Sequence, residues 1–122
     1  MDFWFLMMGA GLSLVSALLH GVLGGQLYME NINSSAMEPL TKSLSLVSWH
    51  VFTIFLVVCS CTLGYIAYNP VFSSAAYPII AINLLGAILF VVLGITNHGV
   101  LLSMPGAYLM GGTAVIAWLG IS

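Results

Sequence analysis

The histidines are the residues in this chain that are best suited to chemistry. The sequence has three of them, His20, His50 and His98, and each lies near one end of a long apolar stretch. If each stretch is a helix rising about 1.5 Å per residue, all three imidazoles reach a similar depth at the same end of a helical bundle. Imidazole nitrogens bind zinc and copper, and histidines on facing helices also hold haem. We therefore consider a three-histidine metal site for copper or zinc, with haem b as a further alternative.

Oxygen donors at the same end of the expected bundle would add to such a site. Gln26 and Glu30 follow His20 along the chain and are candidate additional ligands, with Glu38 in the same polar segment. The alternative is that the histidines only form hydrogen bonds or lie at the edge of the apolar region. His98 precedes a glycine, as a residue at the end of a helix often does.

Other kinds of site are not supported by the sequence. Asp2 is expected at the opposite end from every histidine, so a Ser-His-Asp set cannot be assembled. The apolar stretches carry no paired carboxylates, which argues against a proton or ion relay through their centre. The single basic side chain, Lys42, makes no basic patch and excludes nucleic acid as a partner. We expect no catalytic activity of the chain's own.

The composition predicts the elements that must position these side chains. Hydrophobic residues make up 61% of the 122 residues and charged residues only 3%, whereas a soluble domain has about a quarter charged residues. Such a chain cannot cover itself with a water-facing surface. We therefore predict an all-α integral membrane protein, a bundle of four antiparallel transmembrane helices.

Four apolar segments have the length of a membrane span, which is about 20 residues. They form a single domain over residues 1–122, with helices at about 3–27, 44–68, 78–96 and 100–121. An even number of crossings places both termini on one side, and the polar loop 28–43 on the other. Asn69-Pro70 ends the second helix, while Pro105-Gly106 bends or delays the fourth. We expect a multi-pass protein of the bacterial cytoplasmic membrane, with Lys42 favouring a cytoplasmic location for the loop.

Small residues recur at every fourth position of the first helix. This spacing lets another helix approach closely, so that packing and weak hydrogen bonds hold the two together. The partner helix is either within the bundle or on a neighbouring subunit. In the third helix, Asn83 should find a hydrogen-bond partner, for which Thr53, Ser60 and Thr62 are candidates. The helix-packing residues are Gly9, Ser13, Ala17, Gly21 and Gly25.

The first half of the chain resembles a group of small, uncharacterised bacterial four-helix membrane proteins. The resemblance lies in the pattern His20-x-x-x-Gly24-x-Gln26, followed by a polar loop and Trp49-His50-x-x-Thr53. Gln26 stands near the place where an acidic residue is expected, and the loop has less arginine than the pattern. The group has no established activity to transfer. The resemblance implies only that His20 and Trp49-His50 belong together.

With so little aqueous surface, the chain is best suited to a role within the bilayer. We expect an accessory or structural subunit of a larger integral membrane complex, with other membrane subunits and bound lipid as partners. The alternative is a metal- or haem-binding membrane protein that uses the three-histidine cluster near one membrane face.

Overall fold

The computed structural model describes all residues, 1–122, and contains helices but no strands. Three helical rods are long and apolar enough to cross a membrane. The remaining apolar helix, Gly106–Ile121, is shorter. The elements, in chain order, are α1 (Phe3–Leu18), the π-helical turn η1 (Leu19–Gly24), α2 (Gly25–Asn33), α3 (Pro39–Tyr68), the 3-10 segment η2 (Pro70–Ala75), α4 (Ala76–Thr96), the 3-10 segment η3 (Gly99–Ser103) and α5 (Gly106–Ile121).

The first two rods are longer than the sequence suggested. α1, η1 and α2 form one rod of 31 residues that ends at Asn33 rather than Leu27. α3 begins at Pro39 rather than Leu44, because proline fits the first turn of a helix, where its missing N–H is not needed. The expected loop of residues 28–43 is therefore reduced to residues 34–38. At the N-terminal end of the first rod, the carboxylate of Asp2 caps α1 by accepting hydrogen bonds from the backbone N–H groups of Trp4 and Phe5.

The fourth apolar segment is divided. The sequence suggested one helix over residues 100–121 that Pro105-Gly106 bends or delays, and α5 indeed begins only at Gly106. η3 ends at Ser103, and Met104 is extended (φ −81°, ψ 147°) because it precedes Pro105. α5 then has only 16 residues, or about 24 Å at 1.5 Å per residue. This helix is shorter than the roughly 30 Å of a hydrocarbon core.

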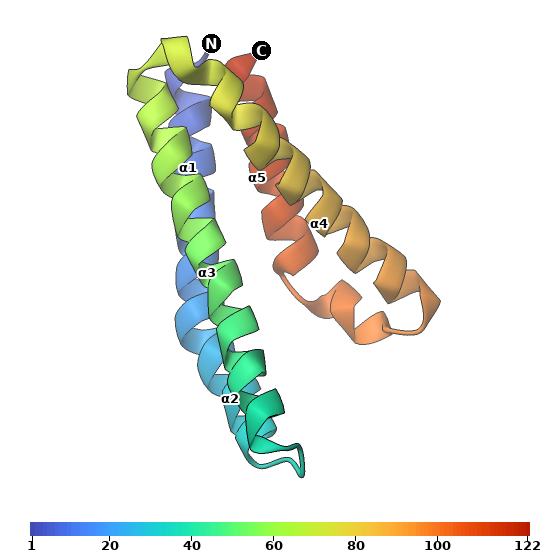
Figure 1. Cartoon of the computed structure of the whole chain (residues 1–122). Helices are drawn as coiled ribbons and strands as arrows, with labels where there is room; N and C mark the ends of the chain where they lie inside the picture. The colour runs from blue at the N-terminus through green and yellow to red at the C-terminus, as the bar shows by residue number, and fades with distance from the viewer.

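The rods form two helical hairpins that are joined at one end and diverge at the other, like an inverted V (Figure 1). One hairpin is α1–α2 with α3, and the other is α4 with α5. α1 also packs along α5, while α3 makes little contact with α4. Both chain termini lie at the joined end, where the N–H of Asp2 donates to the carbonyl of Gly120 at 2.7 Å.

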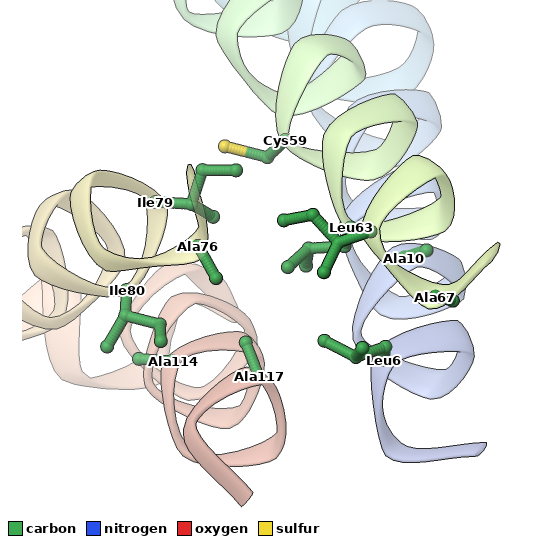
Figure 2. Close-up of a cluster of buried hydrophobic side chains, with 11 residues drawn as sticks. Leu6, Ala10, Cys59, Leu63, Ala67, Ala76, Ile79, Ile80, Ala114 and Ala117 are labelled. Atoms are coloured by element: carbon green, nitrogen blue, oxygen red, sulfur yellow. The ribbon is translucent and has the colours of Figure 1, made fainter. Parts of the chain in front are cut away.

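The apolar core lies at this joined end of the molecule (Figure 2). Its residues come from the first turns of α1 and α4 and from the later turns of α3 and α5, so all four long helices meet there. The side chains are Leu6, Ala10, Cys59, Leu63, Ile66, Ala67, Ala76, Ile79, Ile80, Ala114 and Ala117. No comparable core joins the two hairpins at the divergent end.

The small-residue stripe of the first rod lies mainly against α3, within the chain. Ser13 is fully buried and its hydroxyl donates to the carbonyl of Leu56 at 2.8 Å. A reciprocal bond runs from the hydroxyl of Ser60 to the carbonyl of Ala10 at 2.7 Å. Gly9 packs near both α3 and α5. The stripe consists of Gly9, Ser13, Ala17, Gly21 and Gly25, as the sequence indicated.

Asn83 is fully buried, but not with the partners that were expected. Its side-chain N–H donates to the carbonyl of Ile79, one turn back in α4, at 2.9 Å, and lies 3.8 Å from the sulfur of Cys59. Its oxygen has no hydrogen-bond partner. Ser60, one of the expected partners, instead bonds to α1.

Candidate functional site

Three aromatic rings stack where the first rod lies against the N-terminal half of α3. The rings of His20 and Trp49 are nearly parallel, with centroids 4.1 Å apart and an interplanar angle of 11°. Tyr28 also stacks on Trp49, at 4.4 Å and 13°. Phe52, one turn after Trp49 in α3, meets the imidazole edge-on at 5.0 Å. His20 is therefore held within an aromatic cluster rather than lying freely at a helix end.

The backbone of η1 is shaped to accept this cluster. The carbonyl of His20 accepts the N–H of Gly25, five residues on, as in a π-helix, and also the indole N–H of Trp49 at 2.9 Å. The close approach needs glycine, because a Cβ at Gly24 would lie 2.9 Å from the indole ring. A Cβ at Gly21 would lie 2.7 Å from the methyl group of Thr53. Single π-helical turns inside α-helices are often found at functional sites.

One nitrogen of the His20 ring is used by the protein and the other is free. Nδ1 is 2.9 Å from the hydroxyl of Thr53, and that hydroxyl lies 3.4 Å from the carbonyl of Trp49. When Thr53 donates to this carbonyl, Nδ1–H donates to Thr53 and Nε2 is an acceptor. Nε2 has no hydrogen-bond partner within the protein. The ring is thus fixed in orientation with one polar atom available.

The side chain of His20 lines a cavity of about 530 Å³ between the two hairpins. The only other polar side chain on its wall that is not aromatic is Ser16, whose hydroxyl already donates to the carbonyl of Leu12 at 2.8 Å. The rest of the wall is almost entirely apolar and comes from both hairpins. Its residues include Leu19, Leu23, Phe52, Leu56, Phe90 and Met110.

The other predicted ligands do not join His20 in one site. His50 is exposed, and its ring lies near Gly25, 3.5 Å from where a Cβ of that glycine would be. Gln26 and Glu30 are also exposed. His98 precedes η3 on the second hairpin, at the divergent end, where α4 has moved away from the first rod (Figure 1). No group of three or more His, Cys, Asp or Glu residues is placed to hold a metal ion.

The structure adds residues that sequence reasoning did not connect with His20. Tyr28 was assigned to a loop, and Phe52 was not considered. A signal was present, because Trp49, Phe52 and Thr53 are spaced i, i+3 and i+4 and therefore share one face of α3. The π-helical turn has no comparable signal in the sequence. Comparison with protein-family models, curated proteins and solved structures gave no match to this chain.

Proposed function

We propose that this chain is a multi-pass protein of the bacterial cytoplasmic membrane and an accessory subunit of a larger membrane complex. The observation that supports this most strongly is its apolar exterior. Hydrophobic residues make up 61% of the chain, yet only 22 of the 122 residues are buried. Large aliphatic side chains in the middle of helices are exposed, such as Ile54 at 62% and Leu85 at 64%. Water does not stabilise such a surface, and hydrocarbon does.

The positions of the charged residues agree with membrane insertion. Asp2 is at the joined end of the hairpins, and Glu30, Glu38 and Lys42 are in or beside the turn that links α2 to α3. No charged residue lies between these two levels. This leaves a continuous band that carries no charge, as a chain that crosses hydrocarbon requires.

The accessory role is inferred from how little of the chain would remain outside such a bilayer. The connections are short, with only residues 34–38 between the first two rods. The hairpins also diverge and leave apolar walls between them that lipid or another subunit must cover. The exposed apolar surface of these helices is suited to packing against larger membrane proteins.

Native electrophoresis of membranes from the source organism tests the accessory role. The membranes are solubilised in a mild detergent, and the chain is detected by an epitope tag. We expect the tag to migrate with a complex much larger than the 13.0 kDa chain, and to return to the monomer position in SDS. A single monomeric band in several mild detergents would contradict the proposal.

A second candidate function is metal or haem binding, which would now depend on His20 and His50. Both residues lie where the first rod packs against α3, since the ring of His20 stacks on Trp49 and the ring of His50 lies near Gly25. Metal analysis and a visible spectrum of the purified protein test this function. Stoichiometric metal or a Soret band that is lost in His20→Ala/His50→Ala, but kept in His98→Ala, would support it. Absence of both signals would exclude it.

A further inference from the structure

We infer that the cavity between the hairpins binds a neutral, single-chain amphiphile whose carbonyl or hydroxyl head group hydrogen-bonds to Nε2 of His20. The inference rests on the proposed membrane location but is independent of the accessory role. It begins from His20, the one histidine that lines the cavity. Nδ1 of His20 is engaged by Thr53 and the hydroxyl of Ser16 by its own helix, which leaves Nε2 as the site for a polar group.

The walls determine the charge of this head group. The four charged residues of the chain are Asp2, Glu30, Glu38 and Lys42, and none of them lines the cavity. A carboxylate, phosphate or ammonium group would have no counter-charge there, and burying an unpaired charge is costly. A hydroxyl group can donate to Nε2 in the tautomer described above. A carbonyl group accepts from Nε2–H in the other tautomer, in which the hydroxyl of Thr53 donates to Nδ1.

The depth of the cavity places the head and the tail. His20 lies 16 residues after Trp4, about 24 Å at 1.5 Å per residue and so near the far edge of a roughly 30 Å hydrocarbon core. Leu56, also on the wall, lies 12 residues before the end of α3 at Tyr68, about 18 Å from the joined end by the same rise. The cavity thus runs from a polar group near the membrane edge to apolar side chains near its middle.

The volume limits the size of the occupant. If each non-hydrogen atom takes about the 30 Å³ that a water molecule occupies in the liquid, the cavity of about 530 Å³ holds roughly 18 such atoms. This is enough for a small head group and one alkyl or isoprenoid chain. A porphyrin or a second transmembrane helix is much larger. The cavity is lined by residues of both hairpins and is open on one side, so a longer tail could continue into the bilayer.

The test measures stabilisation of the purified protein by two probes in dodecyl maltoside micelles. Decylubiquinone carries the carbonyl group on a quinone ring, and 1-lauroylglycerol carries hydroxyl and ester groups on a lipid head. A ligand that binds the folded state stabilises it by RT ln(1 + L/Kd), where L is the free ligand concentration, so the Tm rises with the logarithm of L once this exceeds the Kd. We expect at least one probe to raise the Tm of the wild-type protein in this concentration-dependent manner. The probe that does so identifies a quinone or a glyceride source for the same head-group chemistry.

Two pairs of variants locate the site. His20→Ala should weaken the probe about tenfold, because it removes one hydrogen bond in a site with little water, and His98→Ala should leave it unchanged. Leu23→Trp places an indole in the cavity and should abolish the shift. Leu27→Trp, one turn further along the same rod and outside the cavity, should keep it. Leu23→Trp retains His20, so it tests the site even where His20→Ala is too unstable to measure.

Two results would overturn the inference. One is that neither probe raises the Tm of the wild-type protein. The other is that a probe stabilises the Leu23→Trp and Leu27→Trp variants equally, which would show partition into the micelle rather than binding in the cavity. Because every measurement uses the isolated chain, these results leave the native-gel test of the accessory role unaffected.

Discussion

At the scale of single residues, Trp49 connects most of the groups that define the candidate site. Its indole ring stacks on His20 and Tyr28, and its N–H donates to the carbonyl of His20 at 2.9 Å. That carbonyl belongs to η1, so the same side chain orients the imidazole and stabilises the π-helical turn. Thr53 then fixes the imidazole through Nδ1. The free nitrogen of His20 is therefore positioned by α3 rather than by its own helix.

Replacing Trp49 with phenylalanine separates these contributions. Phenylalanine keeps an aromatic ring but removes the indole donor, so we expect the free energy of unfolding to fall by about 1 kcal/mol, the contribution of one hydrogen bond. Titration with SDS from dodecyl maltoside micelles measures this change. Trp118→Phe is the matched control, because Trp118 is exposed and its indole forms no hydrogen bond. Equal losses in the two variants would contradict the assigned role.

The association of His20 with Trp49-His50 was an expectation from the resemblance alone; in the structure the rings of His20 and Trp49 are stacked. Counting residues along each expected helix grouped His20 with His50 by depth. It also grouped His98 with them, because depth along a helix can be counted from the sequence whereas lateral separation cannot. Tyr28 was missed because a polar run after Leu27 was taken as a loop, although the helix continues to Asn33.

At the scale of elements, glycines determine how closely the first rod approaches α3. Gly21 and Gly24 face Thr53 and Trp49, where a Cβ would come within 3.0 Å of a side chain. Gly11, in the same rod, has no atom within 4 Å of the corresponding position. The same residue type is thus required at one position of the rod and unnecessary at another.

A pair of alanine substitutions tests this difference. Gly21→Ala forces Thr53 away from its position beside His20, and overpacking of this kind costs about 1–3 kcal/mol in the free energy of unfolding. Gly11→Ala should be neutral or slightly stabilising, because alanine favours a helix over glycine by up to about 1 kcal/mol. SDS titration of both variants provides the comparison. Similar effects in the two would mean that the approach of α3 does not depend on Gly21.

The existence of the long helices could be predicted, but several of their ends could not. Apolar length alone indicated the rods, and Asn69-Pro70 correctly marked the end of α3. The other prolines mark different positions relative to a helix: Pro39 begins α3, whereas Pro105 separates η3 from α5. The sequence did mark Pro105-Gly106 as a place where the fourth helix is bent or delayed, and α5 begins at Gly106. It did not mark Pro39 as the start of α3.

At the scale of the whole molecule, the structure is two hairpins joined through one core. The core residues lie towards the end where the termini meet. The opposite ends of the hairpins diverge (Figure 1), and residues of both hairpins line the cavity. The sequence suggested a more uniform bundle. It could not reveal the divergence, because both arrangements expose apolar side chains and a bilayer accepts either.

Reporter fusions test the arrangement of the whole chain in the membrane. We expect the N- and C-terminal fusions to report the same compartment and a fusion within residues 34–38 to report the other, since the termini meet at one end of the hairpins. Lys42 further favours a cytoplasmic location for the turn. Fusion to green fluorescent protein and to alkaline phosphatase at each position gives the measurement. Termini in different compartments would contradict the arrangement.

The stacking of Trp49 on His20 also gives the protein an internal optical probe. The other two tryptophans, Trp4 and Trp118, are exposed. They lie near the start of α1 and the end of α5, at the joined end of the hairpins and away from Trp49. With both replaced by phenylalanine, the remaining emission would come from the indole on the cavity wall. A quinone is a strong quencher of indole fluorescence and a glyceride is not. The emission wavelength and intensity of a single-tryptophan protein would therefore distinguish an empty cavity from one filled by either kind of molecule.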